Sequence, residues 1–312
     1  MSDSTTRLTR NTLYVPASRP DMIEKAAKSA TDAVCIDLED SIPSNKKEES
    51  RKNVIDALLN IEFGHRLRMF RINGIDTHFA YSDIIDVVET AGQNIDLIMI
   101  PKAQKAHDIQ FVDTLLTQIE AHKGIPHRIG IEAQIETASG FLGIRKIAQS
   151  SSRLESLIFG SGDYAASMRM PMDNIGMFDA NDELYPGHRF HAPMHAIVAA
   201  ARTNGLRCMD TPYADFKDDE GFEQACRIAL AMGFDGKQCI HPSQLEITNH
   251  VFAPSPEELT WAREVEAAYE QSSKEGVGVI SLNGKMIDAA NLRMAQTTLQ
   301  KQQAIDEQET GK

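Results

Sequence analysis

The chain has 312 residues, of which 42% are hydrophobic and 25% are charged, the usual balance of a globular protein. Its formal net charge of −13 argues against a nucleic-acid-binding protein, because phosphate recognition requires clustered Lys and Arg. A few cations at one site can still bind a small anion, because surface charge is screened within about 10 Å.

The N-terminus and the cysteines bear on the cellular compartment. Residues 1–10 are polar and lack the apolar segment of a secretory signal, and no apolar run approaches the roughly 20 residues of a membrane helix. The four cysteines are far apart and include no CxxC pair, which argues against disulfides and a zinc site. They are Cys35, Cys208, Cys226 and Cys239. We therefore expect a cytoplasmic protein.

Short apolar runs recur along the chain, with helical patterns between them. The runs span residues 13–18, 33–40, 68–74, 97–102, 128–137, 156–163, 207–212 and 236–242. Such runs are typical of parallel strands buried on both faces. Apolar residues at helical spacing occur in residues 21–30, 45–60, 76–92, 103–123, 140–149, 192–204 and 218–232. This alternation predicts an α/β fold, a (β/α)8 TIM barrel, with an open doubly wound sheet as the alternative.

The composition changes after the eighth strand. Residues 254–275 have the pattern of a long helix, and residues 277–287 form a predicted hairpin around Asn283-Gly284, a strong type I′ turn signal. A last helix is expected from about Asp288. The predicted domains are a catalytic barrel at residues 11–252 and a C-terminal lid extension of helix and β-hairpin at residues 253–312.

Polar residues recur at the predicted carboxyl ends of the strands, where barrel enzymes have their active sites. They are Arg19, Glu39, Asp40, Arg71, Lys102, Glu136, Asp163, Asp210 and His241. One or two would be ordinary loop charges, but a ring of them predicts a functional site, because a buried charge is costly unless it is paired or metal-bound. The long connection at residues 169–191 borders the same rim, and connections of this length are usually functional or disordered.

Glu136 and Asp163 are the strongest candidates for a metal site. They end neighbouring strands, and Mg²⁺ is usually held by one or two carboxylates together with substrate oxygens. The alternative is an ion pair with Arg71 or Lys102. Arg71 suits a bidentate grip on a carboxylate or enolate oxygen, and its alternative role is a structural salt bridge at the rim.

A second candidate site lies at the start of the first helix. Its N-terminus, flanked by Arg19 and with Lys25 one turn further on, offers a place for phosphate oxygens, although Arg and Pro are common at helix starts. The segment 160–163 lacks the third glycine of a dinucleotide-binding fingerprint. The nearby histidines, interpreted as surface or supporting residues rather than metal ligands, are His188, His191 and His195.

Together these residues resemble the malyl-CoA lyase and citrate lyase β-subunit superfamily (HpcH/HpaI aldolases), and most closely the malyl-CoA/β-methylmalyl-CoA lyases. The resemblance runs from residue 13 to about residue 299. It rests on the motifs PASRPDMIEKA, IDLEDSI, FRINGID, IMIPK, EAQIET, FGSGDYAASM, DGKQCIHPSQ and NGKMIDAAN. Residues 172–190 depart from the family in local sequence, which leaves the side-chain specificity open.

The resemblance implies a role for each candidate residue. Glu136 and Asp163 would bind Mg²⁺, for which Mn²⁺ can substitute, and Arg71 would hold the substrate carbonyl or enolate oxygen. Asp288 would be the acid/base, presented by the lid of a neighbouring subunit in a homotrimer or hexamer; its alternative role is a helix N-cap. The resemblance also implies two further groups. Glu39, Asp40 and Lys102 would surround the catalytic centre. The CoA site would be formed by Tyr14, Arg19, Lys25 and Pro242.

The implied reaction is a reversible retro-Claisen cleavage. Malyl-CoA, β-methylmalyl-CoA or citramalyl-CoA would give acetyl-CoA or propionyl-CoA plus glyoxylate or pyruvate. Arg71 would offset the enolate charge and Asp288 would protonate the enolate carbon. Three alternatives remain open: a citrate lyase β-type subunit, a malyl-CoA thioesterase, and a non-catalytic binding barrel.

Overall fold

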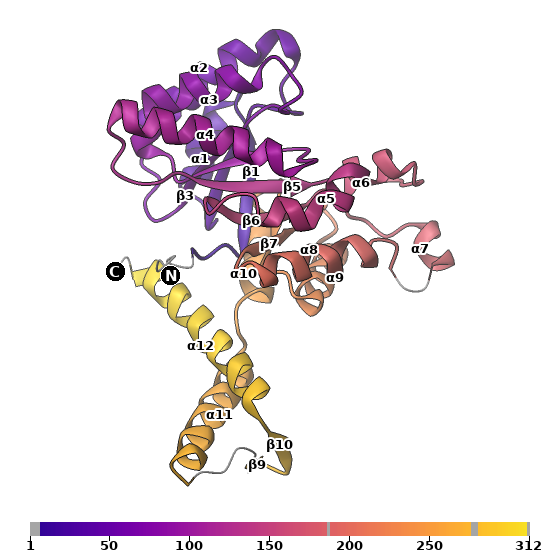
Figure 1. Ribbon diagram of the computed structural model, residues 1–312. Coiled ribbons are helices and arrows are strands. Elements are labelled where there is room, and N and C mark those ends of the chain that lie inside the picture. The colour runs from indigo at the N-terminus through magenta and orange to yellow at the C-terminus, as the bar shows by residue number, and fades with distance from the viewer. Residues whose placement is uncertain (1–6, 186–187, 276–279, 311–312) are drawn as a thin grey trace. The chain divides into compact units, whose positions relative to one another are not determined.

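The computed structural model describes residues 7–185, 188–275 and 280–310. Its central feature is a closed barrel of eight parallel strands, in which β1 pairs with both β2 and β8. Figure 1 shows strands of this barrel with helices such as α4 and α8 outside them. This closure confirms the predicted TIM barrel and excludes the open sheet. The strands are β1 (Asn11–Pro16), β2 (Ala33–Asp37), β3 (Leu67–Arg71), β4 (Leu97–Ile100), β5 (Gly130–Ile135), β6 (Leu154–Phe159), β7 (Arg207–Asp210) and β8 (Gly236–Cys239).

Helices follow each strand of the barrel. They are α1 (Pro20–Ala27), α2 (Lys47–Asn60), α3 (Ala80–Ala91), α4 (Ala106–Lys123), α5 (Ala138–Ala148), α6 (Ser161–Met168), α7 (Ala180–Leu184), α8 (His191–Thr203), α9 (Asp219–Met232) and α10 (Gln244–Val251), with short 3-10 turns at Ser44–Lys46 and Gly92–Asn94. Several features differ from the prediction. The sixth strand ends at Phe159 rather than at residue 163, and the long connection contains the short helix α7. The helices α6 and α10 were not predicted.

The interior of the barrel changes from apolar to polar along the strands. A buried cluster fills its middle, formed by Cys35, Met69, Leu97, Met99, Ile158 and Met209. Each such large side chain contributes about 1.5–3 kcal/mol to stability when buried. Side chains alternate between the two faces of a strand, so the residue two positions further on points to the same side. In β2 and β3 these residues are Asp37 and Arg71, and polar groups therefore occupy the carboxyl end of the barrel.

The chain divides into two compact units, the barrel at residues 9–249 and a second unit that consists of the described N-terminal residues 7–8 and the chain from residue 250 onward. The second unit has a small core formed by Ala262, Val265, Ile287 and Ala295. Its elements are α11 (Pro256–Glu275), β9 (Ile280–Leu282), β10 (Lys285–Ile287) and α12 (Ala289–Thr310). The role of this unit as a lid stays a prediction.

The predicted hairpin is present in the second unit. β9 and β10 pair antiparallel, and the turn residues Asn283 and Gly284 have φ angles of 52° and 78°, as a type I′ turn requires. The predicted hairpin residues 277–279 lie outside the described residues. No helix in the described part of the chain combines the length and apolar character needed to cross a membrane. All four cysteines are free and buried.

Candidate active site

A cavity of about 320 Å³ opens at the carboxyl ends of the barrel strands. One part of its lining is polar or charged: Tyr14, Asp37, Asp40, Arg71, Gln134, Glu136 and Asp163. Another part is apolar: Val15, Pro16, Ile175, Pro212 and Ile240. The cavity therefore brings together four of the predicted rim residues: Asp40 after β2, Arg71 at the end of β3, Glu136 after β5 and Asp163 in α6.

Glu136 lines this cavity directly after β5, and only 1% of the residue is exposed to solvent. Its Oε1 accepts the backbone N–H of Lys102 over 2.7 Å, and its Oε2 accepts an N–H from the Gln134 side chain over 2.6 Å. Gly160 lies against it so closely that a methyl group there would be 2.4 Å from Glu136 Oε2. The carboxylate is therefore fixed by neighbours on three sides.

Asp163 faces the same cavity from the first turn of α6. The helix N-terminus favours its negative charge. Its Oδ1 lies 3.8 Å from Lys102 Nζ. The prediction that Asp163 ends a strand is wrong, but the residue reaches the predicted rim because α6 begins only one residue after β6.

Glu136 and Asp163 fit a divalent cation. Burial, together with the negative charges of Glu39 and Asp163, raises the pKa of Glu136 to about 8 despite the opposing charge of Arg71. A cation near Glu136 would remove this repulsion. The described residues contain no group of three or more His, Cys, Asp or Glu able to hold a metal. The chain would thus supply two carboxylates and leave positions for substrate oxygens, as is usual for Mg²⁺.

Arg71 is held by a bidentate ion pair with Asp37, in which Nε and Nη2 donate to the two carboxylate oxygens over 2.6 and 2.8 Å. Its Nη1 lies 3.0 Å from Glu39 Oε2, and its guanidinium lies 5.5 Å from the ring centre of Tyr14. Burial opposes ionisation of Asp37, but the charge and hydrogen bonds of Arg71 lower its pKa to about 2. The remaining N–H groups of Arg71 are available to a ligand in the cavity.

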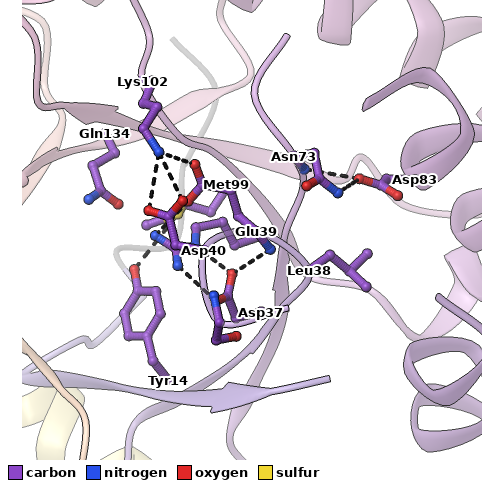
Figure 2. Close-up of polar contacts among 12 residues, drawn as sticks. Tyr14, Asp37, Leu38, Glu39, Asp40, Asn73, Asp83, Met99, Lys102 and Gln134 are labelled. Carbon is purple, nitrogen blue, oxygen red and sulfur yellow. Dashed lines mark hydrogen bonds and ion pairs between the residues drawn. The ribbon is translucent and has the colours of Figure 1, made fainter. Parts of the chain in front are cut away.

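Lys102 links the acidic residues of the rim. Figure 2 shows its ammonium directed at both Glu39 and Asp40, and Asp40 lies 3.1 Å away. Burial alone would lower the pKa of Lys102, but the hydrogen bond and charge of Glu39 and the charge of Asp40 raise it. Its φ of 49° is rare for a residue other than glycine and often marks a functional position. Burial raises the pKa of Glu39 despite its two cationic neighbours.

Three of the residues predicted at the CoA site are exposed on one side of the barrel. Arg19 is the N-cap residue of α1, Lys25 lies in the last turn of that helix, and Pro242 follows the adjacent strand β8. Asp21 pairs with Arg19 over 3.0 Å, and the Lys25 side chain is 79% exposed. The fourth predicted residue, Tyr14, lies deeper: its hydroxyl contacts Met99 Sδ at 3.8 Å (Figure 2).

Asp288 lies in the second unit and caps α12. Its Oδ1 accepts the backbone N–H groups of Ala290 and Asn291 over 2.8 and 3.2 Å, and its own N–H donates to Asn291 Oδ1. The alternative role predicted for Asp288, a helix N-cap, is therefore present in the structure. The cap uses Oδ1 of Asp288 and leaves Oδ2 for another interaction, so it does not conflict with the acid/base role. That role stays a prediction.

Two rim predictions are wrong in position. Asp210 is buried outside the cavity, in an ion pair with Lys237, because it follows the inward-pointing Met209 and so points to the other face of β7. His241 stacks on Phe216, with ring centres 4.5 Å apart, and is absent from the cavity lining.

Six polar residues of the cavity were missed from the sequence: Asp37, Ser41, Gln134, Ser161, Thr211 and Gln238. The alternation of side chains along β2 and β5 could have identified Asp37 and Gln134, because it places them on the same face as Cys35 and Glu136.

Comparison with known proteins gives a consistent result. A family model described as HpcH/HpaI aldolase/citrate lyase matches residues 10–242. An L-malyl-CoA/β-methylmalyl-CoA lyase from Rhodobacter capsulatus is 42% identical over 296 residues, which is 93% of either chain. A (3S)-malyl-CoA thioesterase from Cereibacter sphaeroides is 35% identical over 298 residues, 95% of either chain. A crystal structure of protein CitE from Mycobacterium tuberculosis in complex with magnesium, acetoacetate and coenzyme A superposes with a TM-score of 0.73. It is 28% identical, and the match covers 93% of this chain and 97% of that one.

Proposed function

Because the chain belongs to the HpcH/HpaI aldolase/citrate lyase family, we propose that it is a Mg²⁺-dependent carbon–carbon lyase acting on a 3-hydroxyacyl-CoA thioester. The proposed substrates are (S)-malyl-CoA, β-methylmalyl-CoA and citramalyl-CoA, cleaved reversibly to acetyl-CoA or propionyl-CoA plus glyoxylate or pyruvate. The observation that carries the proposal is the placement of Glu136, Asp163 and Arg71 in one cavity at the carboxyl end of the barrel. In this arrangement two carboxylates can hold a cation while a fixed guanidinium faces the substrate.

Glu136 and Asp163 are the proposed metal ligands. A bound Mg²⁺ would polarise the hydroxyl and carboxylate oxygens of the substrate and orient the keto acid product. The chain itself keeps the two carboxylates in position: Lys102 and Gln134 hydrogen-bond to Glu136, and the α6 N-terminus holds Asp163.

Arg71 is the proposed electrostatic catalyst. When the bond between C2 and C3 breaks, its electrons pass to the thioester and negative charge develops on the thioester oxygen. Asp37 fixes one edge of the guanidinium, so the free N–H groups need no reorganisation to donate to that oxygen. Electrostatic stabilisation of this kind is typically worth several kcal/mol. Glu39 and Asp40 hold Lys102 beside this centre.

The remaining assignments complete the proposal. Arg19, Lys25 and Pro242 would flank the CoA moiety, and Tyr14 would lie near its thioester end. Asp288 would deliver a proton to the enolate carbon in cleavage and remove it in condensation. We place Asp288 in a neighbouring subunit of a cytoplasmic homotrimer or hexamer, in which the second unit covers the next barrel.

A product assay tests the proposal. Purified protein with (S)-malyl-CoA and Mg²⁺ should release acetyl-CoA and glyoxylate, and the reverse mixture should form malyl-CoA. Release of free CoA and malate without acetyl-CoA would instead indicate a thioesterase, the activity named for the 35% identical relative. No change in any substrate would indicate a non-catalytic barrel.

A further inference from the structure

The connection between α6 and α8 sends one side chain into the active-site cavity. Of the described residues in this connection, Ile175 is the one whose side chain reaches far enough to pack on Gly162 and line the cavity. A methyl group on Gly162 would be 3.1 Å from Ile175 Cδ1, and Gly162 directly precedes the proposed metal ligand Asp163. Ile175 is 38% exposed, so it presents apolar surface to the cavity rather than to the core.

The backbone around Ile175 is fixed to the loop after β7. The Ala214 N–H donates to the Ile175 carbonyl over 2.9 Å, and Asn174 Oδ1 accepts the Ile175 N–H over 3.0 Å. Gly176 has a φ of 76°, and a methyl group there would be 2.2 Å from the Pro212 carbonyl oxygen. Only glycine fits this approach without displacement, so the chain turns sharply at Gly176 and Ile175 has a defined position.

Arg189 links the other described residues of this connection to one another. Its Nη2 lies 3.0 Å from Asp179 Oδ2, its Nε lies 2.9 Å from Asp182 Oδ1, and its Nη1 donates to the Pro171 carbonyl. Ile175 therefore belongs to a connection that is fixed to the loop after β7 and whose described residues are linked to one another by Arg189.

The cavity lining contains both charged and apolar groups. Arg71 and Asp163 are among its charged residues, whereas Ile175, Pro212 and Ile240 are apolar. The charged groups would stabilise the carboxylate and carbonyl oxygens of a keto acid. Because Ile175 packs on Gly162, next to Asp163, we expect the remaining substituent of the carbonyl carbon to meet the Ile175 side chain. That substituent is a hydrogen in glyoxylate and a methyl group in pyruvate. We infer that Ile175 is a specificity-determining residue that limits the size of this substituent and favours glyoxylate; this inference rests on the proposed lyase function.

Condensation kinetics test this role. Wild type, Ile175→Val and Ile175→Ala are assayed with acetyl-CoA, Mg²⁺ and either glyoxylate or pyruvate. The wild type should prefer glyoxylate. Ile175→Ala should raise the ratio of kcat/KM for pyruvate to that for glyoxylate by about tenfold or more, the usual effect of a methylene-sized change in an apolar pocket. Ile175→Val should shift the ratio in the same direction by less.

Leu184→Ala is the matched control, because Leu184 belongs to the same connection and is 83% exposed. It should leave the ratio unchanged. An unchanged ratio in active Ile175→Ala and Ile175→Val enzymes, or a wild-type preference for pyruvate, would overturn the inference while the lyase function stands. If Ile175→Ala does not fold, Ile175→Val decides. Absence of condensation by the wild type would overturn the proposed function, and this inference with it.

Discussion

Glu136, a proposed metal ligand, is held in position by residues that are not themselves proposed ligands. Its two oxygens are oriented by the Lys102 backbone and the Gln134 side chain, and Gly160 leaves just enough room for the carboxylate. Lys102 can direct its N–H at Glu136 because its backbone adopts the left-handed conformation. The affinity for a cation should therefore respond to substitutions that remove no carboxylate.

Gly160→Ala is the first such substitution. The new methyl group would lie 2.4 Å from Glu136 Oε2 and 2.7 Å from Glu136 Cβ, so the whole Glu136 side chain must move. We expect the Kd for Mg²⁺ to rise by about 10- to 100-fold, as for other groups that orient metal ligands. Isothermal titration calorimetry measures the Kd, and circular dichroism checks that the barrel is intact. Wild-type affinity in the folded variant would show that Glu136 does not bind the metal.

The pH dependence of Mg²⁺ binding follows from the raised pKa of Glu136. In the metal-free protein this carboxyl group binds a proton more tightly than in the unfolded chain. It therefore contributes stability that is fully present below its ordinary pKa of 4.5 and is lost as the pH rises through about 8. Mg²⁺ must displace that proton, so its affinity should fall by about tenfold for each pH unit below about 8. Calorimetry between pH 6 and 9 measures this slope. A slope of zero for the wild type, or the same slope in Glu136→Gln, would contradict the assignment.

Arg71→Lys tests the proposed electrostatic role. Lysine keeps the positive charge but lacks the planar guanidinium group. That group allows Arg71 to bind Asp37 and to face the cavity at the same time. We expect kcat to fall by about a hundred- to a thousandfold, the usual effect of losing a preorganised donor. Arg68→Lys is the matched control, because Arg68 lies on the same strand and pairs with Asp96 away from the cavity lining. Equal kinetics in both variants would mean that Arg71 has only a structural role.

At the level of the elements, the sequence was most informative where short apolar runs alternate with helical patterns. This alternation predicted all eight barrel strands, because a parallel strand covered by helices is apolar on both faces. It failed after β6, where eight residues are too few for α6 to show a clear helical period, and Asp163 was placed on a strand. It also could not show that Arg189 links distant residues of the long connection, since that depends on ion pairs with Asp179 and Asp182.

Asp288 combines two predicted roles at one helix end, and two substitutions separate them. Asparagine caps a helix as well as aspartate does, whereas alanine loses about 1 kcal/mol. Asp288→Asn should therefore preserve the thermal stability of the protein, and Asp288→Ala should lower it. Both should lose most lyase activity, because neither side chain transfers a proton. Differential scanning calorimetry measures the thermal stability, and a coupled enzymatic assay measures the lyase activity. Full lyase activity in Asp288→Asn would show that Asp288 serves only as a helix N-cap and not as the acid/base.

At the level of the whole molecule, the barrel contains the proposed metal ligands and Arg71, but the proposed acid/base belongs to the other compact unit. The family motifs in the sequence predicted these residues, yet no pattern within a single chain shows which subunit's Asp288 serves which barrel. That relation depends on the symmetry of the oligomer, in which each interface is repeated. It can be determined by mixing subunits that carry different defects.

Asp288→Asn and Arg71→Ala provide such a pair, since each is expected to be nearly inactive alone. The two proteins are unfolded together, refolded as mixed oligomers and compared with the same proteins refolded separately. If Asp288 acts on a neighbouring barrel, some sites will combine an intact Arg71 with an intact Asp288 from another chain. In an equal mixture roughly a quarter of the sites should then be active, because closed symmetric assembly draws the two chains at random. If Asp288 acts within its own chain, every site retains one defect, and the mixture stays as inactive as its components.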